Sequence, residues 1–121
     1  MSTKNVESAG LRERSSLRLL CSNLIRPATR VELCGLIDES LFFDELHRAV
    51  FEEIRETGAV PAARLRQELE RRVVERGFAE FRLGEFLSPE VASEGEIEEL
   101  FGNILRMIEM GHGEHETGTS H

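Results

Sequence analysis

The chain has 121 residues, of which 40% are hydrophobic and 31% charged, a composition that fits one globular domain and excludes a disordered chain. Its net charge of −8 argues against a surface built to bind nucleic acid, because phosphate contacts need clustered Lys and Arg. No apolar run approaches the roughly 20 residues of a membrane span.

Both ends of the chain are polar. Residues 1–10 predict a disordered N-terminal arm. Residues 111–121 contain Gly, His, Glu, Thr and Ser without an apolar side chain, and they predict a disordered C-terminal tail. Residues 11–110 carry helical periodicity and are expected to form one helical domain.

The first two helices are predicted on either side of a proline. The apolar positions of the first helix, over residues 11–25, are Leu17, Leu20, Cys21 and Leu24. Their spacing of i, i+3, i+4 and i+7 predicts one buried face, and Pro27 ends the helix. Thr29, with Glu32 three residues later, has the spacing of a capping box and begins a short second helix. Val31 and Cys34 are expected to face inward from it, and Leu36 and Ile37 are further candidates for that face.

The third and fourth helices are the most clearly bounded. Asp44 is a good N-cap residue for the third helix, and Gly58 suits its C-terminal end. Pro61 suits the first turn of the fourth helix, and Gly77 ends it. The predicted buried positions are Leu46, Val50 and Ile54 in the third helix and Leu65, Leu69 and Val73 in the fourth.

Two further helices complete the prediction. The fifth is expected over residues 78–87, before Pro89. The sixth begins at Ser93 or Glu94 and ends near Met110. Its apolar positions, which give the strongest periodicity in the chain, are Ile97, Leu100, Phe101, Ile104, Leu105 and Ile108. No segment alternates as a strand does, so the sequence predicts an all-α, compact six-helix bundle.

The charges are unevenly distributed along the chain. Residues 11–30 hold five Arg and one Glu, a net charge of +4, whereas residues 90–116 hold eight Glu and one Arg, a net charge of −7. Such an asymmetry suits the steering of a charged protein partner, although solvated helix faces with an acidic tail would also produce it.

No motif for catalysis, for a metal or for a cofactor is present. The phosphate-binding pattern GxxxxGK[ST], the pair CxxC and the zinc motif HExxH are all missing from the sequence. His112, Glu114, His115 and His121 lie together in the tail, but a metal site needs fixed geometry, so no metal is expected there. His47 is the one histidine in a predicted helix, and Asp44 three residues earlier is a hydrogen-bond partner for it in a structural role.

Cys21 and Cys34 are the only two cysteines. Each lies on a predicted apolar stripe, where a free cysteine behaves as a small hydrophobic residue. Two such residues make no disulfide framework, and we expect a reducing, cytoplasmic location.

One segment carries information beyond its composition. It runs from Phe42 to Ile54 and contains Phe43, His47, Arg48, Val50, Phe51 and Ile54 at fixed spacing. This segment, together with the Leu-rich first helix, resembles the C-terminal helicase-binding domain of bacterial DNA primase of the DnaG type. It also resembles the N-terminal domain of DnaB-type replicative helicases, which shares that six-helix fold. In the predicted packing, Phe43 staples the entry to the third helix, and Val50 and Ile54 are buried.

The resemblance implies a non-catalytic domain that docks primase on the replicative DNA helicase and modulates it. It implies a monomer in isolation, with no cofactor and no sequence-specific contact to nucleic acid. The helicase domain usually has a Gly-Gly pair before its fifth helix, whereas this chain has only Gly77 there. We therefore favour the primase relative, whose parent protein is a DNA-directed RNA polymerase.

Two alternatives stay open. A helicase N-terminal collar domain predicts self-association, and a small regulator that binds nucleic acid through the basic first helix predicts salt-sensitive DNA binding. For the partner contact we name Met107 and Met110 on the last helix, since Met adapts to partner surfaces. The same two residues would equally complete the core.

Overall fold

The computed structural model describes the backbone of residues 12–88, 91 and 93–119, with side chains as far as Glu109. A helix over residues 12–20 comes first. The elements that follow are α2 (Pro27–Leu36), the 3-10 turn η1 (Glu39–Leu41), α3 (Glu45–Thr57), α4 (Ala62–Glu75), α5 (Leu83–Phe86) and α6 (Glu94–Thr119). Within these described ranges every regular element is helical, which confirms the all-α prediction and its six helices.

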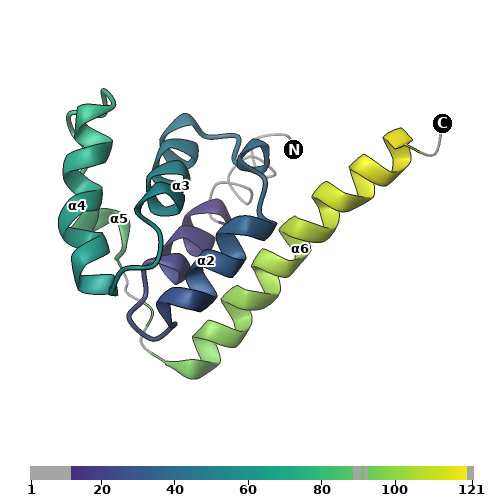
Figure 1. The fold of residues 1–121 in the computed structure, drawn as a ribbon, viewed down its shortest axis with the longest axis horizontal. Helices are drawn as coiled ribbons and strands as arrows, with labels where there is room; N and C mark the ends of the chain where they lie inside the picture. The colour runs from purple at the N-terminus through teal and green to yellow at the C-terminus, as the bar shows by residue number, and fades with distance from the viewer. Residues whose placement is uncertain (1–11, 89–90, 92, 120–121) are drawn as a thin grey trace.

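Helix α3 is central, with α2 packed on one side of it and α4 on the other. Helix α6 lies alongside α2 and runs in the same direction (Figure 1). Its C-terminal part projects past the rest of the bundle. Among the described residues, no helix is both long enough and apolar enough to cross a membrane.

The N-terminal helix ends five residues earlier than predicted. Its last helical residue is Leu20, and the Ser22 hydroxyl accepts a hydrogen bond from the Leu24 backbone N–H at 3.1 Å. A serine that bonds its local backbone in this way competes with helix continuation. Leu24 therefore leaves the predicted buried stripe and is exposed, whereas Leu17 and Cys21 are fully buried.

Helix α2 begins at Pro27, and the predicted capping role of Thr29 is wrong. Pro27 occupies the first helical position, where its fixed φ and missing N–H cost nothing. The Arg30 backbone N–H donates to the carbonyl oxygen of Arg26 at 3.0 Å, which makes Arg26 the N-cap residue. A proline at the first helical position thus outweighs a capping-box spacing two residues later.

The predicted limits of α3 are confirmed. Asp44 Oδ1 accepts from the backbone N–H groups of Leu46 at 2.8 Å and His47 at 3.1 Å. At the other end Gly58 has a φ of 75°, a left-handed value that a glycine adopts without strain.

Helix α4 also matches its prediction, but α5 is much shorter than expected. After α4 the chain turns at Gly77, whose φ is 115°. A further turn follows, in which the Phe81 N–H donates to the Phe78 carbonyl oxygen, so that α5 starts only at Leu83. The Glu70 carboxylate on α4 accepts from the Leu83 N–H at 2.9 Å and holds this start.

Helix α6 begins at Glu94 as predicted, with the Ser93 hydroxyl accepting from the Glu96 N–H at 3.2 Å. It continues to Thr119, although the sequence predicts an end near Met110 and a disordered tail. Extending an existing helix avoids the cost of nucleation, which allows it to run through residues of low helix propensity.

The core lies between all of these elements. Its fully buried side chains are Leu17, Leu19, Leu20, Cys21, Phe42, Val50, Phe51, Leu65, Leu69, Val73 and Ile104. The predicted buried faces of α3 and α4 are therefore confirmed at Val50, Ile54, Leu65, Leu69 and Val73, whereas Leu46 is only partly buried.

Candidate protein-docking face

Apolar side chains that no helix of the bundle covers lie on α2 and α6. Val31 and Leu36 on α2 are 43% and 55% exposed, and Leu105 on α6 is 48% exposed. We call the exposed apolar side chains Val31, Leu36 and Leu105 the docking face. Because α2 and α6 run side by side (Figure 1), one partner segment can contact both helices.

The α6 part of this face follows from helical spacing. Phe101, Leu105 and Ile108 recur at i, i+4 and i+7, which places them on one side of the helix. Ile104 and Met107, on the adjacent side, are buried in the core. Phe101 and Ile108 are partly buried and pack against the core, so Leu105 is the edge of the apolar arc that remains in solvent.

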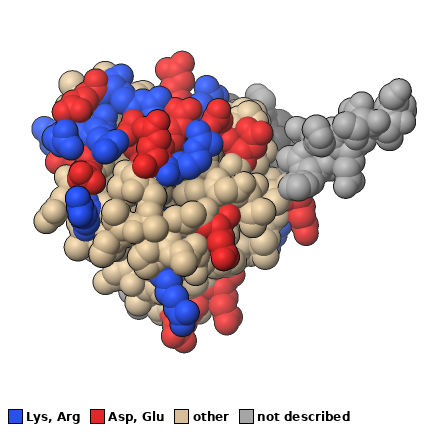
Figure 2. Space-filling model, viewed as in Figure 1, with Lys and Arg blue, Asp and Glu red and all other residues tan. Residues whose placement is uncertain are grey.

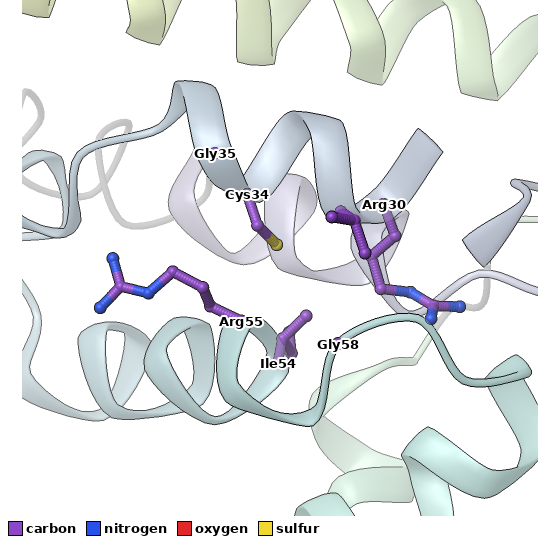
Figure 3. A pocket seen from close by; sticks show the side chains of 7 residues that line it. Arg30, Cys34, Gly35, Ile54, Arg55 and Gly58 are labelled. Carbon is purple, nitrogen blue, oxygen red and sulfur yellow. The ribbon is translucent and has the colours of Figure 1, made fainter. Parts of the chain in front are cut away.

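A cavity of about 200 Å³ opens beside the docking face, between α2 and the C-terminal end of α3. It is lined by Arg30, Val31, Cys34, Gly35, Ile54, Arg55 and Gly58. In Figure 3 the Cys34 side chain points from α2 towards Ile54 on α3, while the guanidinium groups of Arg30 and Arg55 lie at opposite ends of the view. The middle of the cavity wall is therefore apolar.

Acidic side chains border the α6 part of the docking face. Among the described side chains of α6 there are five glutamates and one arginine, a net charge of −4. Glu94, Glu98 and Glu109 stand three, four or seven positions from Phe101 or Leu105, on the same side of the helix. At the top of the molecule in Figure 2, by contrast, basic and acidic side chains are interleaved.

A network of ion pairs joins α3 and α4. The buried Glu53 carboxylate lies 3.3 Å from both Arg72 and Arg76, and Arg76 also pairs with Glu52 at 2.6 Å. The Glu52 hydrogen bond raises the pKa of the Arg76 guanidinium. Arg72 and Arg76 therefore serve the packing of α4 on α3.

His47 belongs to a buried polar cluster that the sequence did not reveal. Its Nδ1 lies 3.0 Å from Glu13 Oε1, and the Glu13 side chain is only 4% exposed. The same carboxylate accepts from the backbone N–H groups of Phe43 at 3.1 Å and Asp44 at 3.4 Å. Glu13 thus joins the N-terminal helix to the start of α3, and His47 has the structural role that we expected, though with a different partner.

Arg30 is the second polar group that sequence reasoning missed. Its side chain is 1% exposed, and it donates to the carbonyl oxygens of Leu20 at 2.8 Å and Val60 at 2.6 Å. Burial lowers the pKa of the guanidinium. Arg30 satisfies carbonyl groups at the end of one helix and in the α3–α4 connection, so its role is to hold the fold together.

In the segment that suggested the resemblance, some side chains are buried, one bonds to the backbone, and one is exposed. Val50 and Ile54 are buried, as predicted, and Phe51 is buried with them. Arg48 donates from Nε and Nη2 to the Phe42 carbonyl oxygen, at 3.1 and 2.9 Å.

Phe43 does not staple the helix entry, because its side chain is 77% exposed. Phe42 is buried instead, and its ring stacks on Phe51 with the centroids 4.9 Å apart.

The two predicted contact methionines do not form an exposed site. Met107 is 6% exposed, and its sulfur lies 3.3 Å from the Ser16 hydroxyl on the N-terminal helix, so it completes the core. The side chain of Met110 lies outside the described residues, as do those of His112, Glu114, His115 and His121. Leu105, two residues before Met107, is the large apolar residue that is exposed among the described side chains of this helix.

The two cysteines are buried and free, as predicted. Burial raises the pKa of Cys21 to about 12 and that of Cys34 to about 11. We expect a thiol-specific reagent at pH 8 to label the native chain about 100-fold more slowly than the urea-unfolded chain, because only the thiolate reacts. Fast labelling of the native chain would contradict the burial.

These pKa shifts make the free energy of unfolding depend on pH in the alkaline range. Unfolded thiols ionise near pH 8.5, whereas Cys34 in the folded chain stays protonated up to pH about 11. The unfolded state therefore loses protons first, and the thiols lower the free energy of unfolding as the pH rises through this interval.

No family model, no curated protein and no solved structure matches this chain.

Proposed function

We propose that this domain is a non-catalytic docking module for the replicative DNA helicase, of the type found at the C-terminus of bacterial primase. The observation that carries the proposal is the docking face, where apolar side chains of α2 and α6 remain in solvent. Contiguous exposed apolar surface with a polar border is typical of protein-interaction sites. The segment from Phe42 to Ile54 supports the choice of family, and the docking face supports an interaction role.

The proposed mechanism is surface complementarity. Desolvated apolar anchors contribute most of the free energy of binding at such interfaces, and charged residues at the rim mainly set the rate of association. Binding here would fix primase activity in space next to the helicase ring and change the rate of the helicase motor.

The test is co-migration of the domain with the ring helicase of the same organism on a sizing column, with the helicase ATPase rate measured in parallel. We expect the domain to elute as a monomer alone, to shift into the helicase peak when mixed, and to alter the ATPase rate. The double variant Leu36→Ser/Leu105→Ser should lose the shift, because both residues are exposed and their loss removes apolar contact area.

Gln67→Ala is the matched control. Gln67 is exposed on α4, which lies on the far side of α3 from α2 (Figure 1), so this variant should co-migrate like the unaltered domain. If the unaltered domain neither shifts into the helicase peak nor changes the ATPase rate, helicase is not the partner. Self-association of the domain alone would contradict the primase assignment and favour the helicase collar.

A further inference from the structure

We propose that the cavity between α2 and α3 binds a small organic carboxylate, with the apolar group of the ligand in the middle of the cavity and its carboxylate at the Arg55 end. Binding at this site does not depend on the proposed docking function. Three features of the described residues support it: the volume of the cavity, its apolar middle and the sign of the charges in its wall.

The cavity is large enough for one aromatic ring. Its volume is about 200 Å³, and an apolar cavity of roughly 150 Å³ can already hold a benzene molecule. Gly35 on α2 and Gly58 at the end of α3 both line it, and a Cβ built on either would meet no atom within 4 Å. Both glycines therefore leave their part of the wall open to a ligand.

The middle of the cavity is apolar and accessible. Val31, Cys34 and Ile54 contribute to its wall, and the Cys34 side chain points from α2 towards Ile54 (Figure 3). Val31, which the sequence placed in the core, is 43% exposed and lies where solvent meets the cavity. An apolar group that enters this space removes apolar surface from water on both the ligand and the wall. Such a wall, with a few polar groups at its edge, is typical of small-molecule sites.

Both charged residues that line the cavity are arginines. The guanidinium groups of Arg30 and Arg55 lie at opposite ends of the view in Figure 3. Burial raises the pKa of the Cys34 thiol, whereas the charges of Arg30 and Arg55 act on this pKa in the opposite direction. The two arginines therefore make the potential at a side chain of the cavity wall more positive, which favours an anionic ligand over a cationic one.

Arg55 is the residue that can bind the carboxylate directly. Its Nη2 pairs with Glu39 at the surface, where both side chains are more than 40% exposed. A guanidinium has five N–H donors in a planar fork, so the same group can accommodate a second carboxylate. Its carbon also lies over the Phe51 ring, 5.4 Å from the centroid, which favours one position of the side chain.

The probe is phenylpropionate, whose two-carbon arm separates the ring from the carboxylate, and its uncharged analogue is phenylpropanol. Binding of each compound to the intact chain is followed by two-dimensional NMR of the backbone amides. We expect phenylpropionate to shift the amides of Cys34, Gly35 and Gly58 saturably, with a dissociation constant on the order of a few millimolar. It should bind about fivefold more tightly than phenylpropanol, with an advantage that shrinks at high salt.

Variants then locate the site. Arg55→Gln should remove the preference for the acid, whereas Arg71→Gln should keep it, because Arg71 is equally a surface arginine in an ion pair, with Glu75 on α4. Gly35→Leu places a side chain at the cavity and should abolish the amide shifts with both compounds. Gly102→Leu on α6, at a helical glycine with equally open surroundings, should not. Circular dichroism verifies that each variant keeps the fold.

Equal affinity for phenylpropionate and phenylpropanol would overturn the proposal, as would equal effects of Arg55→Gln and Arg71→Gln. Amide shifts that spread over the whole chain without saturation would show non-specific binding and would also contradict a site in this cavity. None of these comparisons involves the helicase, so their outcome is separable from that of the co-migration experiment.

Discussion

Phe42→Ala is expected to lower the free energy of unfolding by about 3–5 kcal/mol, whereas Phe43→Ala, one residue later, should change it by less than about 0.5 kcal/mol. Phe42 is fully buried and stacks on Phe51, so its removal loses apolar burial, an aromatic contact and close packing. Phe43 is 77% exposed, and its side chain has little to lose. The two substitutions are chemically identical, so each is the control for the other.

Urea denaturation of the two variants, followed by circular dichroism, gives the comparison directly. The slopes of the transitions should agree with that of the unaltered chain, so that the midpoints report stability. Equal destabilisation by both substitutions would contradict the burial of Phe42 alone. A greater loss at Phe43 would show that Phe43, and not Phe42, is the buried ring.

Glu13→Gln is the second substitution with a large expected effect, a loss of about 2–4 kcal/mol. The Glu13 carboxylate accepts from the Phe43 N–H and lies 3.0 Å from His47 Nδ1, with both side chains largely buried. An amide in the same place has one oxygen and one NH2 group, and in either orientation the NH2 group faces a backbone N–H, that of Phe43 or that of Asp44. The N-terminal helix would then lose its polar attachment to the start of α3.

The matched control for this substitution is Glu39→Gln. Glu39 pairs with Arg55 at the surface, where both side chains are more than 40% exposed, and such pairs contribute at most about 1 kcal/mol. A double-mutant cycle with His47→Gln should show coupling between Glu13 and His47. Additive losses, or a Glu13→Gln loss no larger than that of the control, would contradict a structural role for this pair.

Several signals that act within one or two helical turns were read correctly from the sequence, although the capping role of Thr29 was not. Asp44 caps α3, Gly58 ends it and Gly77 follows α4, because each of these roles depends on the backbone geometry of adjacent residues. Likewise the spacing of Leu65, Leu69 and Val73 determines which side of α4 is buried. The sequence alone thereby established the helical class and the middle of the bundle.

Where two neighbouring residues have equally apolar side chains, packing decides which of them is buried. Two consecutive phenylalanines precede α3, and periodicity cannot distinguish them because the connector has no regular period. The position of Phe51 on α3 determines that Phe42 enters the core. In the same way Leu105 and Met107 both belong to the apolar pattern of α6, but only Met107 meets the N-terminal helix.

The partners of the buried polar side chains and the residues of the docking face can be identified only from the tertiary structure. Glu13 and His47 are 34 positions apart, and Arg30 reaches carbonyl groups ten residues before it and 30 residues after it. No local pattern connects such distant residues, since their partners are set by the way the helices pack. Sequence periodicity shows which side chains prefer burial, whereas the number of neighbouring helices decides which of them, such as Val31 and Leu105, remain uncovered.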